Sequence, residues 1–252
     1  MTLDLDAIVA AGGPWVRAER IGDCLLLQGD CREVMPVLPK VCAVLTDPPY
    51  GIGESGDKRR YGPKSAAKGF SACKEYAGGD WDRETPAQEV FDYLTSFPAI
   101  IWGGNYFMSK IAQDASRWLI WHKKGTDKSS FADCEMAWTN LGGATRYFRR
   151  DWVGFGAINS GEDRQHRTQK PLDLMEWCLG FLPDARTILD PFAGSFTTAV
   201  ACQRLGRQSI SIEMDPAYYP IGLKRVQDVV NNPPLFKVEA AKPKPTQKAM
   251  DI

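Results

Sequence analysis

The sequence predicts an α/β fold built on a doubly wound, mostly parallel β-sheet. Short apolar runs alternate with stretches of helical spacing, which is the pattern of strands joined by crossover helices. Two of these runs lead into polar turn motifs, at the place where open parallel sheets bind their ligands. A length of 252 residues, with 44% hydrophobic and 25% charged residues, fits one large globular domain.

The first strands are expected early in the chain. Residues 24–28 form a short apolar run that ends at Gly29-Asp30, and residues 31–38 are expected to make one or two helical turns. Residues 41–46 are a second apolar run that leads directly into the tetrapeptide 47–50. Because its two prolines cannot continue a hydrogen-bonded ladder, this tetrapeptide must lie at the carboxyl end of the strand.

The middle of the chain is less regular. Residues 99–102 and 118–121 are strand candidates, with a helix-like stretch at 106–115 between them. Residues 145–153 alternate aromatic and basic side chains, as an exposed or edge strand would. Two polar segments without a period, 51–79 and 159–168, are expected to be loops, and long loops inside a domain are often functional.

The C-terminal part contains a βαβ pattern. Residues 171–182 have helical spacing and begin with a proline, and residues 187–189 form a strand followed by the loop DPFAGSFTT. A helix to Leu205 and a strand at 208–212 complete the unit, and residues 216–230 predict a last helix.

The loop after the strand at 187–189 has the features of an adenosine-binding loop. Gly194 lets the backbone approach a ligand, and the hydroxyl residues Ser195, Thr197 and Thr198 suit the start of the next helix. Glu213 ends the following strand, where a carboxylate can accept hydrogen bonds from the vicinal hydroxyls of a ribose. The dinucleotide fingerprint G-x-G-x-x-G is absent, which disfavours a nicotinamide dehydrogenase.

The tetrapeptide Asp47-Pro48-Pro49-Tyr50 suits chemistry on an exocyclic amine. The lone pair of such an amine is delocalised into the base, so the amine is a poor nucleophile. A carboxylate and a backbone carbonyl held side by side can accept its two N–H groups and stabilise the positive charge that develops on methylation. The prolines supply rigidity, and Tyr50 offers a face for a base taken out of the helix.

Together these motifs resemble those of the DNA amino-methyltransferases, which act on adenine N6 or cytosine N4. The catalytic motif precedes the cofactor motif, as in the beta, circularly permuted subgroup. The likeness extends over residues 24–230 and includes GDC at 29–31, WGGN at 102–105, WHK at 121–123, SFADCEMAW at 130–138 and TQKP at 168–171. It implies the S-adenosylmethionine-dependent methyltransferase (Rossmann-like) fold, and a site-specific enzyme of the restriction-modification type. In this family, serine is commoner at the position of Asp47 in the enzymes that methylate cytosine, so Asp47 favours adenine as the target.

The resemblance also assigns residues. Asp47, Pro48, Pro49 and Tyr50 would hold the target base. The cofactor S-adenosylmethionine would be held by Asp30 near its adenine, by Glu213, and by Thr168 and Lys170 near its methionine end. The loop after the strand at 187–189 would supply the other contacts, which are Asp190, Pro191, Phe192, Ala193, Gly194, Ser195 and Thr197.

The chain departs from the family at one position. Family members usually read G-S-G-T where this chain has Gly194-Ser195-Phe196-Thr197. A phenylalanine in place of glycine restricts the backbone and adds bulk. We expect the Phe196 ring to point into the core behind the helix. The alternative is an altered and weaker cofactor pocket.

The net charge is zero, yet basic residues are concentrated in two segments. Residues 57–74 and 117–170 each carry a basic surplus, and such surpluses can contact phosphates of double-stranded DNA. Loops 51–80 and 125–165 are therefore candidate recognition insertions. The residues expected to contact DNA are Lys58, Arg59, Arg60, Lys64, Lys68, Arg149, Arg150, Arg164 and Arg167.

The remaining expectations concern organisation and partners. Residues 1–23 are an expected N-terminal extension, 24–231 the methyltransferase domain, and 232–252 a flexible Pro- and Lys-rich tail. Seven cysteines without a C-x-x-C pair and two histidines predict no metal site, and the acidic start and lack of a long apolar run predict a cytoplasmic chain without membrane contact. Because the chain has little room for a separate recognition domain, we expect it to recognise a short DNA sequence or to need a homodimer for recognition.

Three other functions remain open. Cytosine-N4 methylation needs the same chemistry as adenine-N6 methylation. Methylation of RNA or of a protein amide is a second reading, although asparagine at position 47 would favour the amide. A catalytically silent nucleic-acid-binding relative is a third.

Overall fold

The computed structural model describes residues 2–53, 82–123, 132–150 and 168–233, and within them the strands form one nine-stranded sheet. The strand order is β1-β2-β9-β8-β3-β4-β6-β5-β7. The central strands β2, β9, β8, β3 and β4 are parallel, whereas β1 and β6 run antiparallel to their neighbours. The strands are β1 (Arg17–Ile21), β2 (Cys24–Gln28), β3 (Ala43–Thr46), β4 (Ala99–Trp102), β5 (Arg117–His122), β6 (Cys134–Thr139), β7 (Arg146–Arg149), β8 (Thr187–Asp190) and β9 (Gln208–Glu213).

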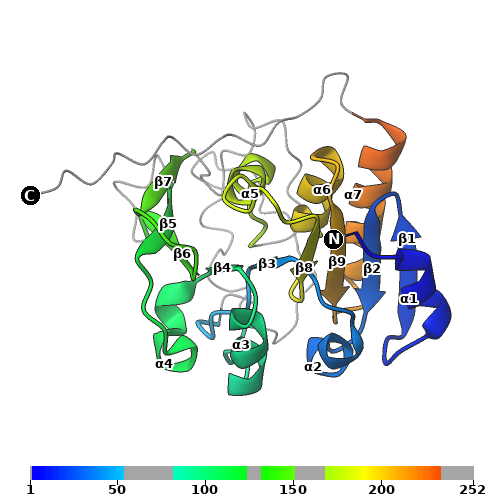
Figure 1. Cartoon of the computed structure of the whole chain (residues 1–252), viewed down its shortest axis with the longest axis horizontal. Helices are drawn as coiled ribbons and strands as arrows, with labels where there is room; N and C mark the ends of the chain where they lie inside the picture. The colour runs from blue at the N-terminus through cyan, green and yellow to red at the C-terminus, as the bar shows by residue number, and fades with distance from the viewer. Residues whose placement is uncertain (1, 54–81, 124–131, 151–167, 234–252) are drawn as a thin grey trace, which may run out of the picture.

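Helices cover both faces of the sheet (Figure 1). One face carries α5, α6 and α7, and the other carries α2, α3 and α4, while α1 lies beside β1. The chain is therefore doubly wound, as the sequence predicts. The helices are α1 (Leu5–Ala11), α2 (Cys31–Val34), α3 (Gln88–Thr95), α4 (Met108–Ile111), α5 (Leu172–Leu179), α6 (Thr197–Arg204) and α7 (Tyr219–Asn231).

The central strands are apolar on both sides because both of their faces are covered. In β2, Leu26 points into the core shared with α5 and α6, whereas Leu25 and Leu27 point into the core on the α2 and α3 side. In β3, Leu45 and Val44 divide in the same way. This two-sided burial explains why β2 and β3 read as continuous apolar runs rather than as alternating patterns.

The parallel strands bring the polar turns to one edge of the sheet. Neighbouring strands β2, β9, β8 and β3 run in the same direction, so their carboxyl ends lie together. Asp30 follows β2, Glu213 and Asp190 end β9 and β8, and Asp47 follows β3. These four carboxylates come from distant parts of the chain and reach this edge through the strand order alone.

The N-terminal segment is part of the sheet rather than an extension of it. All five residues of β1 pair with β2, so a boundary placed before Cys24 would cut through a hairpin. Leu5 of α1 is 2% exposed, and the Leu3 backbone makes two hydrogen bonds with the Gln208 side chain, at 2.7 and 2.9 Å. The prediction missed β1 because RAERI has no apolar run, as an edge strand with one solvated face need not.

Two further elements differ from the sequence-based expectations. The stretch 106–115 is not one helix but a short 3₁₀ turn at Gly104–Tyr106 followed by α4, which stops where Ala112 takes a left-handed conformation (φ 46°). The segment 125–165 is not a loop throughout, because its described part contributes β6 and β7 to the sheet. The rest of both candidate recognition loops, apart from residues 51–53, and the tail from residue 234 lie outside the described residues.

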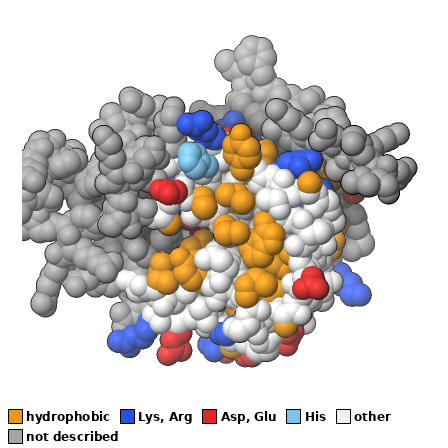
Figure 2. Space-filling model, turned by 90° about the vertical axis from the view of Figure 1, so that its left-hand side faces the viewer, with side chains coloured by type: hydrophobic (Ala, Val, Ile, Leu, Met, Phe, Trp, Pro, Cys, Tyr) orange, Lys and Arg blue, Asp and Glu red, His pale blue; other side chains and the backbone are white. Residues whose placement is uncertain are grey.

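The outer strands leave apolar side chains at the surface. Figure 2 views the molecule from the β7 side and shows hydrophobic side chains gathered on that face. Tyr147 of β7 is 71% exposed and Met108 of α4 is 44% exposed.

No helix in the described parts of the chain combines the length and apolar character that crossing a bilayer requires.

Candidate active site

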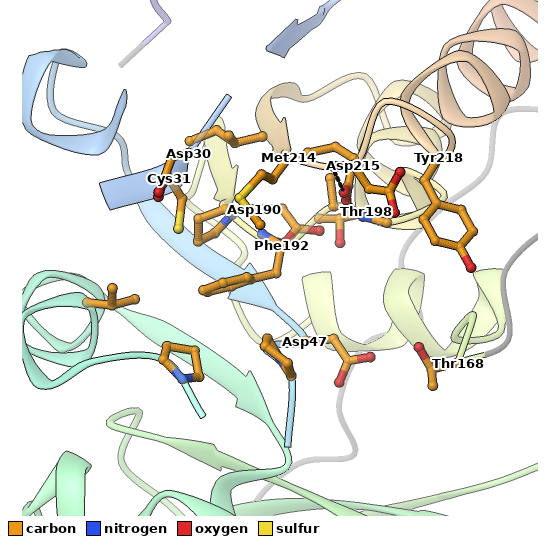
Figure 3. A pocket seen from close by; sticks show the side chains of 18 of the residues that line it. Asp30, Cys31, Asp47, Thr168, Asp190, Phe192, Thr198, Met214, Asp215 and Tyr218 are labelled. Atoms are coloured by element: carbon orange, nitrogen blue, oxygen red, sulfur yellow. Dashed lines mark hydrogen bonds between the residues drawn. The ribbon is translucent and has the colours of Figure 1, made fainter. Parts of the chain in front are cut away.

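The two sequence motifs line one cavity. It has a volume of about 970 Å³ and is bordered by the turn after β3 and by the loop between β8 and α6. In Figure 3, Asp47 and Thr168 lie on one side of the cavity, Asp30, Met214 and Asp215 on the other, and Asp190 and Phe192 between them. Asp47 is therefore on the same side of the sheet as the loop 190–194, which a shared site requires.

Glu213 is fixed at the cavity by backbone N–H groups. The Gly194 N–H donates to its Oε2 at 2.6 Å and the Asp215 N–H donates to its Oε1 at 2.7 Å. Each carboxylate oxygen keeps a lone pair for a further donor. The β8–α6 loop and the end of β9 thus hold one carboxylate in a fixed orientation, as recognition of a pair of hydroxyls needs.

Asp190 is buried beneath the same loop. Its Oδ1 accepts from the Thr46 hydroxyl at 2.7 Å and from the Phe192 N–H at 3.2 Å, so it ties the end of β3 to the loop after β8. Burial raises the pKa of Asp190 to about 6 and that of Glu213 to about 7, despite the hydrogen bonds that both accept. This edge of the sheet therefore holds two carboxyl groups that titrate near neutrality.

Phe196 has the backbone conformation that a glycine would supply. Its φ of 59° and ψ of 35° are left-handed, yet its side chain is fully buried. The ring packs edge-on against Tyr219, with 5.8 Å between ring centroids, and lies against Gly222 of α7. The expectation that the ring points into the core is confirmed, and the ring does not line the cavity.

Arg225 of α7 holds the loop from behind. Its Nη1 donates to the Ser195 carbonyl and hydroxyl at 2.5 and 2.9 Å, and to the Thr197 hydroxyl at 3.0 Å. The Ser195 hydroxyl in turn donates to Gln169 Oε1 at 3.2 Å. Ser195 and Thr197 therefore line the cavity with their hydroxyls already bonded inside the protein.

Asp30 caps helix α2 at the far side of the cavity. Its carboxylate accepts from the Arg32 N–H at 2.9 Å and forms an ion pair with the Arg32 guanidinium. The hydrogen bonds from Arg32 hold the pKa of Asp30 below its usual range, so this carboxylate is ionised at neutral pH.

Asp47 is the centre of a largely buried polar network. Its Oδ1 accepts from the Tyr50 hydroxyl at 2.6 Å and its Oδ2 lies 2.5 Å from the Lys170 ammonium. Burial raises the pKa of Asp47, and Lys170 opposes that rise. Lys170 therefore contacts the catalytic candidate directly, and it also lines the cavity.

Glu135 of β6 completes this network. It lies in the stretch 130–138 that carries part of the family resemblance, but it is not among the predicted site residues. Its Oε2 lies 3.1 Å from the Lys170 ammonium and 3.4 Å from the Tyr50 hydroxyl, and its Oε1 pairs with Lys123. Burial alone would raise the pKa of Glu135, but the two ammonium groups lower it to about 2. The network thus holds two carboxylates and two ammonium groups.

The Tyr50 ring packs against the end of β4. A side chain at Gly103 (φ 72°) would lie 2.1 Å from the ring, so only glycine fits there. The ring also stacks on Tyr106 with 5.0 Å between centroids and 16° between planes. The WGGN segment thereby fixes Tyr50, whose hydroxyl orients Asp47.

Most predicted site residues meet at the cavity. Those that line it are Asp30, Asp47, Pro49, Thr168, Lys170, Asp190, Pro191, Phe192, Ala193, Gly194, Ser195, Thr197 and Glu213. Pro48 and Tyr50 belong to its supporting turn. The cavity also extends to α3 through residues 84–87, a stretch that the sequence patterns did not mark.

The predicted DNA contacts are divided by the structure. Arg149 is exposed on β7, whereas Arg150 forms an ion pair with Asp173 of α5, so its guanidinium supports the fold. The others, Lys58, Arg59, Arg60, Lys64, Lys68, Arg164 and Arg167, lie outside the described residues. The described residues contain no group of three or more His, Cys, Asp or Glu side chains placed to hold a metal ion.

Comparison with known proteins finds similarity to DNA methylases. Residues 110–224 match the family described as DNA methylase, N6_N4_Mtase. The type II methyltransferase M.HinfI of Haemophilus influenzae is 25% identical over 288 aligned positions, which cover 92% of this chain and 77% of that protein. The DNA adenine methyltransferase YhdJ of Escherichia coli K12 is 41% identical over 66 residues, 26% of this chain and 22% of YhdJ.

A solved structure shows the same fold. The PvuII DNA methyltransferase, described as cytosine-N4-specific, has a TM-score of 0.51 and 13% sequence identity. The similarity covers 86% of this chain and 95% of that protein.

Proposed function

We propose that this chain belongs to the DNA amino-methyltransferases, which act on adenine N6 or cytosine N4, and that it methylates adenine N6 with S-adenosylmethionine as methyl donor. The single observation that carries the proposal is the shared cavity, which joins the turn bearing Asp47 to the loop bearing Asp190 and Glu213. A donor site and an acceptor site must be adjacent for group transfer, and these two motifs are adjacent.

The residues of the cavity fit an adenosine-containing cofactor. Glu213 is held by two backbone N–H groups and keeps lone pairs for the two ribose hydroxyls. Asp30 is an ionised acceptor at the opposite side, suited to a base amino group, and Phe192 offers an apolar ring between them. The cavity volume of about 970 Å³ is ample for a ligand of this size.

The bound cofactor would supply a methyl group on a positively charged sulfur. The chain's own part is to prepare the acceptor. Asp47 can accept one N–H of the target amine, and the rigid Pro48-Pro49 backbone can present a carbonyl to the other. Tyr50 keeps the carboxylate in place through its 2.6 Å hydrogen bond. Asp47 would also stabilise the positive charge that develops on the amine.

Adenine is the proposed target because of the residue at position 47. An aspartate there resembles the adenine-N6 members, while serine is commoner among the cytosine-N4 members. The local similarity to a protein named as a DNA adenine methyltransferase supports this choice. The similarity to the cytosine-N4-specific PvuII enzyme concerns the fold alone.

We further propose double-stranded DNA as the substrate, with the target base rotated out of the helix. The amine is not accessible to the Asp47 turn inside a base-paired stack. Arg149 is the one described basic residue of the predicted set that is exposed on the β7 side. Contacts by the loop at 51–80 and a homodimer remain predictions.

The test is incubation of plasmid DNA with methyl-labelled S-adenosylmethionine, followed by separation of the nucleosides. The proposal expects label in N6-methyladenine. Label in N4-methylcytosine alone would refute the choice of target, and absence of label from DNA together with intact cofactor binding would favour a silent relative.

The variant Asp47→Ala tests the catalytic role. It should reduce methyl transfer by at least about 1000-fold, because the main acceptor for the amine is lost. Cofactor affinity, measured by calorimetry, should stay within about threefold, since Asp47 does not belong to the Glu213 side of the cavity. Asp114→Ala, which removes an exposed carboxylate, is the matched control and should retain both properties.

A further inference from the structure

The Lys170 ammonium occupies the position that the proposed reaction requires to be free. It lies 2.5 Å from Asp47 Oδ2, which is hydrogen-bonding distance for the amine of a target base. The amine becomes positively charged as it takes the methyl group. An ammonium held at the same carboxylate would repel that charge, and the repulsion is strong where water is excluded.

Lys170 cannot withdraw into solvent. Its side chain is 5% exposed, and its ammonium lies 5.4 Å from the centre of the Tyr50 ring and 5.9 Å from that of Trp102. A buried ammonium needs a carboxylate partner, because leaving it unpaired is costly. Glu135 is the second carboxylate within reach, at 3.1 Å.

Glu135 is suited to receive this cation. It is anchored on β6, a strand paired on both sides with β4 and β5, and its Oε1 is held by Lys123. Its Oε2 faces Lys170. A shift of the ammonium toward Oε2 would preserve the charge balance of the network and release Oδ2 of Asp47.

We propose that Glu135 is a positioning residue that takes over the Lys170 ammonium when the target amine binds Asp47. One buried cation then serves two carboxylates in turn. Before the base arrives, the ammonium keeps Asp47 ionised and occupies its Oδ2. When the target amine binds Asp47, the ammonium moves to Glu135. This transfer rests on the proposed methyltransferase function. It forms and breaks no covalent bond.

The test is the pH profile of kcat/KM for DNA at saturating S-adenosylmethionine, where the bound cofactor already occupies the Glu213 side and the acid limb reports ionisation of Asp47 before the base binds. In the described parts of the chain, the groups that act on Asp47 are Lys170, Glu135, Tyr50 and Asp190. Glu135→Gln removes a neighbouring negative charge, so the acid limb should move to lower pH. Since Asp47 is then the only carboxylate that Lys170 contacts among the described residues, kcat/KM should also fall about tenfold.

Lys170→Met gives the opposite shift. Asp47 then faces Glu135 without the cation that contacts both carboxylates, so the acid limb should move to higher pH by about one unit or more. In the double variant Glu135→Gln/Lys170→Met the repulsion is gone, and the limb should return toward the wild-type position with partial recovery of activity over Lys170→Met. A purely structural role of Glu135 would lower activity without moving the limb and without rescue.

Glu89→Gln, an exposed site on α3, is the matched control for the same chemical change. An unmoved limb in Glu135→Gln, with active wild-type protein, would overturn the transfer and leave the proposed function standing. Weaker S-adenosylmethionine binding by Lys170→Met, with an unmoved limb at saturating cofactor, would also overturn it, because Lys170 would then act as a cofactor ligand. Wild-type protein that transfers no methyl group to DNA would overturn both proposals.

Discussion

Phe196 shows how a single residue can keep a glycine's backbone conformation while adding a core side chain. A left-handed conformation costs a non-glycine residue about 1–2 kcal/mol, and a fully buried phenylalanine ring offsets this by about 2–3 kcal/mol of apolar burial. The ring needs space on α7, and Gly222 provides it, because a Cβ at that position would lie 1.7 Å from the ring.

We predict that Gly222→Ala lowers the free energy of unfolding by about 2 kcal/mol, since the new methyl group overlaps the Phe196 ring. In a Phe196→Ala background the same change should instead stabilise the protein by about 0.5–1 kcal/mol, because alanine is the better helix former and the overlap is gone. Urea denaturation of the four proteins measures this coupling. Equal effects of Gly222→Ala in both backgrounds would show that the two residues do not depend on each other.

At the scale of elements, the predicted and observed structures agree best where strands are buried on both faces. β2, β3 and β4 could be predicted from their apolar runs, as could β8 and β9. β1 and β6 could not, because RAERI and CEMAWT mix polar and apolar residues, as strands with a less buried face do. The short α4 ends at a left-handed alanine that has no sequence signal.

The same reasoning explains what could be predicted of the site. Asp47, Asp190 and Glu213 each follow or end an apolar run, so their meeting at one edge follows from a parallel sheet. Glu135 lies inside β6, and pairing of β6 with β4 places it beside the end of β4, where the Lys170 ammonium lies near the Trp102 ring. No spacing in the sequence marks that pair, because the contact depends on strand order.

Helix α1 supplies a prediction at the element scale. Leu5→Ala should lower the free energy of unfolding by about 2 kcal/mol, because a side chain that is 2% exposed would be replaced by a cavity. Thermal unfolding should show a lower Tm. Val16→Ala, at a side chain that is 81% exposed, should change stability by less than about 0.5 kcal/mol. Equal effects of the two changes would mean that α1 does not stabilise the sheet.

For the whole molecule, the carboxyl edge of the sheet couples stability to pH. The pKa values of Asp190 and Glu213 are raised, to about 6 and about 7, because burial disfavours their charged forms. A raised pKa stabilises the fold when the group is protonated. That contribution is complete below the unfolded-state values near 4 and is lost as the pH rises through 6 to 7.

We therefore predict that the free protein loses stability between about pH 5 and about pH 8, and that Glu213→Gln reduces this loss by about 2 kcal/mol. A neutral amide does not have to ionise in a buried place. Denaturation at the two pH values measures the difference, with Glu89→Gln as the control. An identical loss of stability in wild type and Glu213→Gln would contradict the prediction, because ionisation of Glu213 would then cost the folded protein no stability.

The two hydrogen bonds between the Leu3 backbone and the Gln208 side chain have a practical consequence for measuring ligand binding. Gln208 begins β9 and Glu213 ends it, so the two residues lie roughly 17 Å apart along the strand. A biotin or sensor-chip linker attached ahead of Leu3 would leave the protein at the rim opposite the cavity. Immobilised in this orientation, the molecule would present its open mouth to injected nucleotides and duplexes.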